Sequence, residues 1–366
     1  MNFDFSDDQK LLKEQVRKFL ADKCPLKVVR RVLDGNETHA DEVWKGLVEL
    51  GVPATGIPEE YGGLGLSPLE LCVIAEEIGR AAAPVPFDTS VVLATEALKL
   101  AGSDAQKKKW LPLLAEGKAT GTLAVAEGAQ PPKPRNTTTT FGGGRLNGKK
   151  VPVADGEAAT FAIVVAKNSL ALVELAQKGV TKRRVETIDP ARKHCELTFT
   201  DANAELLGTE GEGWRLLERL YDAAAIYFAF AQVGGAEAAM YMARDYALQR
   251  QAFGRAIGSY QAIKHKLADC YVKLELARSN AYYGAMMLTD GGADLPLAAA
   301  AARIAASEAY DFAAKENIQT HGGIGFTWEA DTQFHYRRAK LLALSLGGPM
   351  AWKDKLVTRL EQKNAA

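Results

Sequence analysis

The segment Asn317–Lys340, NIQTHGGIGFTWEADTQFHYRRAK, combines the end of a helical pattern, two adjacent glycines and an aromatic turn. Gln319 supplies an amide just before Gly322 and Gly323, where a ligand can approach bare backbone. A glycine that ends a helix, followed by aromatic residues of the core, would give the same pattern. Taken alone, the segment fits either a ligand-contacting loop or an ordinary helix end.

A second segment, Tyr246–Asp269, reads YALQRQAFGRAIGSYQAIKHKLAD and predicts a helix end, a turn and a new helix. Arg250 stands at the end of the first helix, where its guanidinium could contact a phosphate. An arginine in this place also compensates the helix dipole, which is the simpler explanation for that residue by itself. Only the two segments together make a ligand site the better interpretation.

The composition excludes several classes of protein. Forty-five basic and forty-five acidic residues cancel, so no long-range field would recruit nucleic acid or an anionic membrane. No apolar run reaches the roughly eighteen residues of a transmembrane helix, and the start MNFDFSDDQK lacks the features of a signal peptide. The five histidines show no metal spacing, and the four cysteines are far apart, as expected of buried thiols in a reducing compartment. We expect a cytoplasmic protein without a metal.

Sequence patterns divide the chain into a helical range 1–120, a β-rich range 121–208 and a second helical range 209–366. In the first range, Ser6 with Gln9 and Ser103 with Gln106 have the spacing of capping boxes, in which each side chain satisfies the other residue's backbone amide. The segment PLELCVIAEEIGRAA predicts a helix between them.

The β-rich range consists of short segments such as TFAIVVAK and KHCELTFTD, separated by turn-forming residues. Asn147–Gly148 is the dipeptide most typical of a two-residue hairpin turn, so we expect a hairpin there. The range predicts a small barrel or a pair of packed sheets. The last range holds long alanine-rich segments such as PLAAAAARIAASEAYDFAAKENIQT, which predict an antiparallel helical bundle. The fold class is therefore α+β.

Glycine-rich segments do not form a common nucleotide-binding motif. GGLGLSP, FGGGRLNG and GGIGFTWE all fail the G-x-G-x-x-G pattern, and none follows a predicted strand and begins a helix. The P-loop pattern, H-E-x-x-H and G-x-S-x-G are absent as well. A Rossmann site is therefore not expected.

The segments PEEYGGLGLSPLE, LLGTEGEGW, RQAFG with QAI, and Q-x-x-G-G-x-G-F together resemble the acyl-CoA dehydrogenase family over essentially the full length. The resemblance implies an N-terminal helical domain, a middle β domain and a C-terminal four-helix bundle that builds dimers and usually tetramers. It also implies FAD-dependent α,β-dehydrogenation of an acyl-CoA thioester. In that reaction a carboxylate removes the α-proton, the flavin takes the β-hydride, and an electron-transfer flavoprotein receives the electrons.

The resemblance further implies that the bundle donates half of an FAD site across a subunit boundary. In the family, the arginine of R-x-x-F-G, the glutamine of QAI and the Q-x-x-G-G backbone contact the neighbouring subunit's FAD around its pyrophosphate and adenosine. A guanidinium, amides and bare glycine backbone suit a doubly anionic pyrophosphate. The matching positions here are Arg250, Phe253, Gln261, Gln319, Thr320, His321, Gly322 and Gly323.

The positions that would receive a flavin ring differ from the family pattern. Ala126 and Gly128 occupy places where the family usually has a threonine and a proline. Pro152 and Ala154 occupy places where the family presents a tryptophan and a threonine to the flavin. The loss of an aromatic wall and two hydroxyl groups removes stacking and hydrogen bonds, on the order of a few kcal/mol.

Neither of the two positions that supply a catalytic base in the family holds a carboxylate. The match to RRAK places Leu346 at one position, and counting back from YALQR places Ala224 at the other. Asp222 is the nearest carboxylate, but two residues along a helix are about 200° around its axis. Glu218 is about six residues away and is no better placed. Without a positioned base, the C–H proton of a thioester stays in place.

These differences predict a non-catalytic subunit. The pattern HGGIGFTWE…HYRRAK without a following glutamate resembles the paired acyl-CoA dehydrogenases of bacterial steroid and bulky acyl-CoA degradation. Those are α2β2 assemblies, and the resemblance implies that this chain completes the FAD site of a paired catalytic subunit. Two alternatives stay open. One is a homotetrameric enzyme that uses Asp222 or Glu218 as its base, and the other is a flavin-free scaffold with the same fold.

Overall fold

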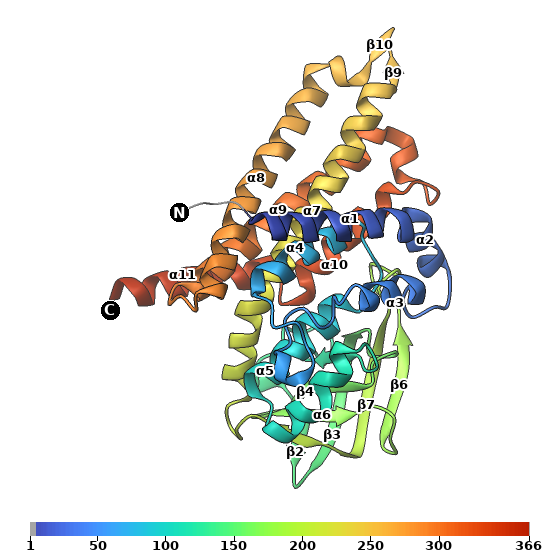
Figure 1. Ribbon diagram of the computed structural model, residues 1–366. Coiled ribbons are helices and arrows are strands. Elements are labelled where there is room, and N and C mark those ends of the chain that lie inside the picture. The colour runs from blue at the N-terminus through green and yellow to red at the C-terminus, as the bar shows by residue number, and fades with distance from the viewer. Residues whose placement is uncertain (1–4, 366) are drawn as a thin grey trace. The chain divides into compact units, whose positions relative to one another are not determined.

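The computed structural model describes residues 5–365, which form two compact units (Figure 1). The helical unit contains the residues up to Val29, Pro68–Ala83 and the residues from Ala225 onward, and the sheet unit contains Arg30–Ser67 and Pro84–Ala224. Helices α2 (Leu26–Asp34) and α7 (Gly213–Gln249) have residues in both units. The three ranges 1–120, 121–208 and 209–366 stay a prediction about domain boundaries.

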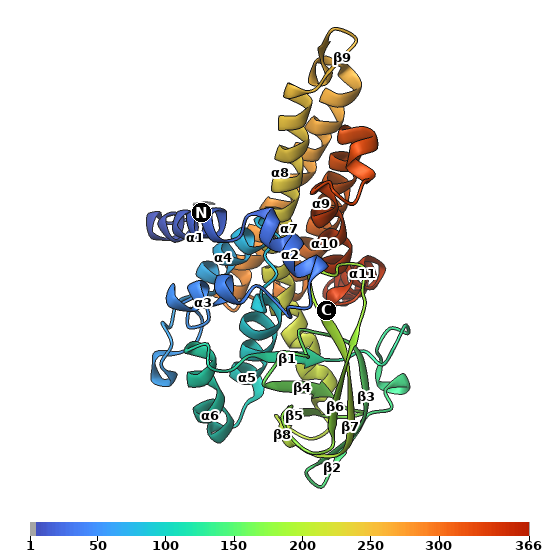
Figure 2. The same ribbon diagram turned by 90° about the vertical axis from the view of Figure 1, so that its right-hand side faces the viewer.

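The helical unit is built mainly from long helices. In both views α7, α8 and α9 run side by side, and α10 and α11 pack on α9 (Figures 1 and 2). The buried face of α9 is largely alanine, which permits close helix contact, as the sequence predicted. Besides parts of α2 and α7, the helical unit contains α1 (Asp7–Lys23), α4 (Pro68–Arg80), β9 (Gln251–Ala252), β10 (Arg255–Ala256), η4 (Ile257–Ser259), α8 (Gln261–Thr289), α9 (Leu295–His321), η5 (Gly322–Phe326), α10 (Thr332–Ser345) and α11 (Pro349–Ala365).

Helices α4 and α7 cross with their backbones in direct contact. A Cβ atom on Gly79 would overlap the carbonyl oxygen of Ala231, and one on Gly234 would overlap the carbonyl oxygen of Glu76. Two glycines on opposite helices therefore remove the side chains that would otherwise hold the helices apart.

This crossing places two glutamates in the interior, where cations from other helices surround them. Glu76 accepts hydrogen bonds from Lys13 Nζ at 2.5 Å and from Arg278 Nη1 at 2.6 Å, and Glu77 accepts one from Arg17 Nη2 at 2.8 Å. Burial by itself would raise the pKa of Glu76, but Lys13 and Arg278 outweigh it and hold that pKa below its usual value. The ion pairs thus join α1 and α8 to α4.

The sheet unit contains two four-stranded sheets, with strand orders β1-β4-β5-β8 and β2-β3-β7-β6. The pair β1–β4 is parallel and the other pairs are antiparallel. Side chains from both sheets form one apolar core, among them Val164, Val173, Leu197 and Phe199, which confirms the predicted pair of packed sheets. The elements are α3 (Asp41–Glu49), η1 (Glu59–Tyr61), η2 (Phe87–Ala94), α5 (Thr95–Ala101), α6 (Asp104–Ala115), β1 (Gly121–Ala124), η3 (Pro134–Asn136), β2 (Thr140–Gly142), β3 (Arg145–Ala154), β4 (Phe161–Val165), β5 (Leu170–Glu174), β6 (Val180–Val185), β7 (His194–Asn203) and β8 (Glu205–Leu207).

The local sequence predictions were partly right. Both capping boxes are present, at the N-termini of α1 and α6. The hairpin turn at Asn147–Gly148 was wrong, because both residues lie inside β3. The turn lies instead at Gly143–Gly144, whose φ angles of +56° and +75° match the two left-handed positions of a tight hairpin turn. Gly148 has φ +140° at a bulge, where a Cβ atom would crowd Thr139.

A buried ion pair connects the end of β1 to β3. Lys150 is fully buried and donates to the carbonyl oxygen of Val125 at 2.9 Å and to Glu127 Oε1 at 2.8 Å. The same carboxylate accepts hydrogen bonds from the backbone and hydroxyl groups of Thr138 and Thr139. Burial by itself would raise the pKa of Glu127, but these donors together hold it far below its usual value. Glu127 is therefore an ionised anchor of the loop that leads into β2.

We predict that Gly234→Ala lowers the free energy of unfolding by about 1–3 kcal/mol, because the new methyl group would press on the backbone of α4. Denaturant unfolding of the purified protein measures the change. Gly142→Ala is the matched control, since a Cβ atom there meets nothing within 4 Å. Equal stability of the two variants would contradict the close crossing of α4 and α7.

We predict that Lys150→Met lowers the free energy of unfolding by about 3–5 kcal/mol, because Glu127 would lose its buried cationic partner. Lys149→Met is the control. The neighbouring Lys149 also forms an ion pair, with Glu196 at 3.4 Å, but it is exposed, and an exposed ion pair contributes little to stability. Equal urea midpoints for both variants would show that the Lys150–Glu127 pair does not stabilise the sheet unit.

Candidate cofactor-donating site

The eight positions matched to the donated half of an FAD site all lie in the helical unit. Arg250 directly follows α7, Gln261 is the first residue of α8, and His321 is the last residue of α9. The rings of Tyr246 and His321 stack with centroids 4.1 Å apart at 25°, so the ends of α7 and α9 are in contact. The chain thus brings its two glycine-containing turns to the same end of the long helices (Figure 1).

Three polar side chains at this end of the bundle have no partner among the described residues. Arg250, Gln261 and Gln319 are exposed, and within residues 5–365 no hydrogen bond or ion pair engages their side chains. The backbone amide of Arg250 completes α7 by donating to Tyr246 O at 2.8 Å. One guanidinium and two amides are therefore available to bind an external anion.

The hairpin β9–β10 exposes an aromatic side chain. Phe253, with φ +52°, and Gly254, with φ +79°, form its turn, and Phe253 is 97% exposed. Tyr260 Oη donates to Ala252 O at 2.9 Å, and the Arg255 guanidinium lies 4.0 Å from the centre of the Tyr260 ring. A non-glycine residue in the left-handed region with a solvated phenyl ring is typical of a contact that another molecule completes.

The glycines after α9 have two different roles. Gly322, with φ +62°, ends the helix, so the interpretation as a helix cap is right for this residue. A Cβ atom on Gly322 or Gly323 would meet nothing within 4 Å, so their backbone is open to a ligand as well. Gly325 is packed instead, since a Cβ atom there would overlap Ile318 O. Thr320 is buried, so its side chain is not open to a ligand.

This donor set fits the pyrophosphate and adenosine of FAD. A guanidinium and amides can donate to phosphate oxygens, and open glycine backbone allows close approach. The first amides of α8, next to Gln261, add the positive end of a 29-residue helix.

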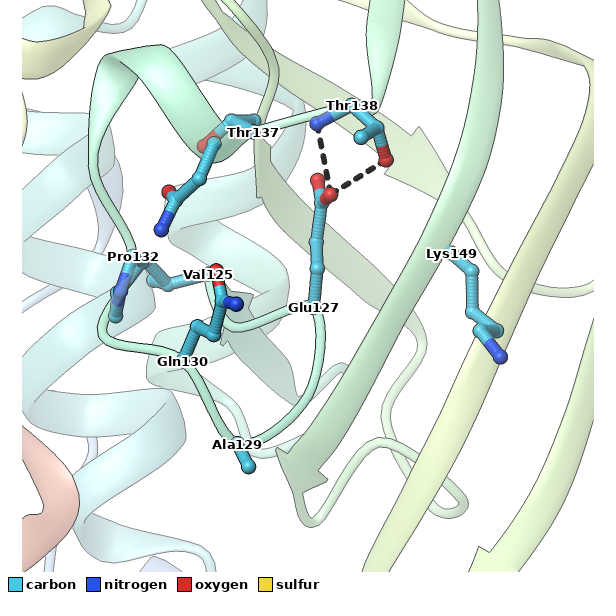
Figure 3. Close-up of a pocket in the computed structure, with 9 residues that line it drawn as sticks. Val125, Glu127, Ala129, Gln130, Pro132, Thr137, Thr138 and Lys149 are labelled. Carbon is cyan, nitrogen blue, oxygen red and sulfur yellow. Dashed lines mark hydrogen bonds between the residues drawn. The ribbon is translucent and has the colours of Figure 1, made fainter.

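The sheet unit has a hollow of about 350 Å³ at the end of β1 (Figure 3). Figure 3 shows Glu127 turned toward Thr138, which donates to it through both its backbone amide and its hydroxyl. Because its oxygens are engaged and its pKa is strongly lowered, Glu127 cannot serve as a general base near neutral pH. The lining contains no aromatic side chain: Val125, Glu127, Ala129, Gln130, Pro132, Asn136, Thr137, Thr138 and Lys149.

The substituted flavin-facing positions have small side chains. Ala126 and Ala154 are half-buried, and Pro152 is exposed on β3. None of these side chains can donate a hydrogen bond or cover the face of a flavin ring. At these positions the sheet unit therefore lacks side chains that would stack on a flavin ring or donate hydrogen bonds to it. The turns that follow α7 and α9, in contrast, fit the pyrophosphate of FAD.

Both family positions for the catalytic base hold buried apolar residues. Leu346 is only 2% exposed, and its carbonyl oxygen accepts a 3.1 Å hydrogen bond from Nε1 of Trp352, which is itself buried. Ala224 is fully buried in α7. Asp222 is also buried, whereas Glu218 is exposed. The structure places no carboxylate at either position.

Sequence reasoning missed two features of these sites. It did not anticipate Tyr246 as the stacking partner of His321, because nothing in the sequence pairs residues so far apart. It also missed the engagement of Glu127 by Lys150 and the threonines. The run NTTTT was a possible signal, since clustered hydroxyl groups can cap a carboxylate.

Within residues 5–365 the chain has neither a metal cluster nor a membrane-spanning helix. No group of three or more His, Cys, Asp or Glu side chains could hold a metal ion. No helix in this part of the chain combines the length and the apolar run that crossing a bilayer requires.

Known proteins match this chain over nearly its full length. Residues 6–118 match the model "Acyl-CoA dehydrogenase, N-terminal domain", and residues 211–349 match "Acyl-CoA dehydrogenase, C-terminal domain". Acyl-CoA dehydrogenase IpdE2 of Mycobacterium tuberculosis is 32% identical over 98% of this chain and 97% of its own length.

Two solved structures share the fold over nearly their full lengths. One belongs to the ChsE4–ChsE5 complex of Mycobacterium tuberculosis, with TM-score 0.89 and 25% identity over 99% of both chains. The other is a variant of the Tcur3481–Tcur3483 steroid ACAD, with TM-score 0.89 and 27% identity over 98% of this chain and 99% of that one. The family models, the full-length relative and the fold agree, and this chain belongs to the acyl-CoA dehydrogenase family.

Proposed function

We propose that this chain is the non-catalytic, FAD-donating subunit of a heteromeric acyl-CoA dehydrogenase. Membership of the family supports oxidoreductase activity on an acyl-CoA. The observation that carries the proposal is a contrast within the chain. Both base positions are filled by buried apolar side chains, Leu346 and Ala224, whereas Arg250, Gln261 and Gln319 are exposed without partners in the described chain.

The structures with this fold support a partner subunit different from this chain and a bulky substrate. Two structures with this fold are described by pairs of proteins, ChsE4–ChsE5 and Tcur3481–Tcur3483, and the second is called a steroid ACAD. We therefore propose a paired acyl-CoA dehydrogenase subunit as the partner and a steroid-derived or similarly bulky acyl-CoA as the substrate. An electron-transfer flavoprotein as electron acceptor and a cytoplasmic location stay predictions from the resemblance.

An exposed apolar stripe on α8 supports assembly with another chain. Val272, Leu276 and Tyr283 are all exposed, and their spacing of four and seven residues places them on one face of the helix. The opposite face, with Leu274, is buried in the unit. A helix that is apolar on both faces is typical of one that a partner covers.

In this assembly the chain binds and orients, and the partner supplies the base. FAD, when bound, supplies the hydride acceptor. Arg250 would donate from its guanidinium to the pyrophosphate, with Gln261 and Gln319 as amide donors. The open backbone at Gly322–Gly323 would let the dinucleotide approach closely. The α-proton of the thioester would be removed by a carboxylate of the partner, because this chain has none at either family position.

Co-expression tests the proposal. We expect this chain alone to be colourless or poorly soluble, and to yield roughly one FAD per pair of subunits when it is produced with the acyl-CoA dehydrogenase encoded beside it. Absorption spectra and the FAD-to-protein ratio of both preparations give the answer. Full flavin loading of the chain alone, with bleaching by an acyl-CoA, would overturn the proposal and would direct attention to Asp222 and Glu218. A flavin-free complex would favour a scaffold.

We predict that Arg250→Ala weakens FAD binding by the complex about 10- to 150-fold, the range for a lost charge-assisted hydrogen bond of about 1.5–3 kcal/mol. FAD titration of the deflavinated complex measures the change. Arg244→Ala is the control, because Arg244 is exposed in the last turns of α7, shortly before Arg250, but pairs with Asp245 at 2.7 Å. Equal FAD affinity of the two variants would argue against a donated pyrophosphate contact.

We predict that Leu346→Glu destabilises the chain by more than about 2 kcal/mol and produces no dehydrogenase activity, because a carboxylate would replace a side chain that is only 2% exposed. Ser345→Glu is the control, since Ser345 is exposed one residue away. Thermal unfolding and substrate bleaching report the two effects. A stable, active Leu346→Glu variant would show that the base site is open after all.

A further inference from the structure

Lys182 lies on β6, the strand at one edge of the sheet β2-β3-β7-β6 (Figure 1). Its Nζ donates to two backbone carbonyl oxygens, that of Glu157 at 2.9 Å and that of Ala159 at 3.2 Å. The residue is exposed, and within residues 5–365 no carboxylate forms an ion pair with it. Lys182 is thus held by neutral oxygens at the rim of the sheet unit.

The charged groups around Lys182 do not engage its amine. Arg184 donates to both carboxylate oxygens of Glu157, at 2.7 and 3.0 Å, so Lys182 contacts only the backbone of that residue. Cys195 lies on the neighbouring strand β7, and burial raises the pKa of its thiol to about 12, so it is uncharged near neutral pH. Partial burial lowers the pKa of Lys182 below its usual value, against the weaker attraction of Cys195 and Glu157.

This environment suits the neutral form of the Lys182 amine. A neutral amine has two N–H groups and one lone pair, and the two carbonyl oxygens can accept from both N–H groups. Neither carbonyl can donate to the lone pair, which is left free to act as a nucleophile. A lysine that pairs with a carboxylate keeps its charged form instead, as Lys109 does with Glu174 at 2.5 Å.

The sheet surface next to Lys182 carries an excess of positive charge. Arg183 and Lys149 share a single carboxylate, that of Glu196, at 3.0 and 3.4 Å. Lys178, four residues before Lys182, is exposed and forms no ion pair in the part of the chain that the structure describes. Because β6 is an edge strand, a long flexible ligand can bind to the outer face and reach around the edge to Lys182. The excess of cations attracts the phosphate groups of a coenzyme A thioester.

We propose that Lys182 is an acylation site, to which acyl-CoA thioesters transfer their acyl group. The Nζ lone pair attacks the thioester carbonyl carbon, a C–N bond forms, and the C–S bond breaks. Coenzyme A leaves as the thiol and takes the proton that the amine loses. The amide product keeps one N–H for one of the two carbonyl oxygens and carries no charge. Family membership supports contact with acyl-CoA whichever subunit carries the base, so the proposal goes beyond the non-catalytic role and does not depend on it.

Acetylation of the full-length protein by acetyl-CoA, a small thioester of this class, tests the proposal. Mass spectrometry of proteolytic peptides gives the rate at each lysine. Lys149 is the internal reference, because it is exposed on the same sheet but lies next to a carboxylate. We expect Lys182 to react at least about threefold faster than Lys149, since the neutral fraction of an amine rises as its pKa falls. Equal rates at the two lysines would overturn the proposal.

Two variants separate the reactive amine from the basic surface. Arg184→Gln releases the Glu157 carboxylate, which can then pair with Lys182 and keep it charged. We expect this variant to slow acetylation of Lys182 by the neutral thioester S-acetyl-N-acetylcysteamine at least about threefold. Arg183→Gln leaves the contacts of Lys182 in place and should slow acetylation by acetyl-CoA only, because the neutral thioester has no phosphate.

The melting temperature of each variant checks its folding, and the comparison of Lys182 with Lys149 in the wild type needs no variant. An Arg184→Gln protein as reactive at Lys182 as the wild type would contradict the role of the neutral surroundings. An Arg183→Gln protein that reacts with acetyl-CoA at the wild-type rate would contradict the attraction of the coenzyme A phosphates. Either result would overturn the proposal as stated and would leave the proposed function untouched.

Discussion

The helical unit depends on the close crossing of α4 and α7. Gly79 and Gly234 remove the side chains between the two helices, and the backbones meet directly. This contact buries Glu76 and Glu77, and a buried carboxylate is tolerated only when cations and hydrogen bonds compensate for the lost water. Lys13, Arg17 and Arg278 provide that compensation from α1 and α8. These ion pairs join α1, α4 and α8 within the helical unit.

Polar groups in this chain fall into two classes. Glu76 and Glu127 are fully engaged by donors of the same unit, and their pKa values are lowered accordingly. Arg250, Gln261 and Gln319 are not engaged by any group of the described chain. The engaged groups stabilise the fold, whereas the available groups are grouped at one end of the bundle. This division supports the proposal that the chain binds a cofactor although neither family position for the base holds a carboxylate.

Local sequence patterns predicted local structure well where a few neighbouring residues decide it. The two capping boxes formed as expected because each depends on only four residues. The hairpin at Asn147–Gly148 failed because a second candidate turn, Gly143–Gly144, lay just before it, and register across β3 and β7 decided between them. The positions proposed for the donated site come from family motifs, and no local pattern predicted the residues that surround them.

The sequence by itself determined the chemical inventory: no carboxylate at 346 or 224, and an arginine, amides and glycines in two recognisable turns. Those statements need only the identity of each residue. The tertiary structure alone decided that Leu346 is buried, that ionised Glu127 pairs with Lys150, and that His321 is stacked on Tyr246. Burial, charge compensation and ring orientation arise from contacts between residues distant in the chain, and no local pattern encodes them.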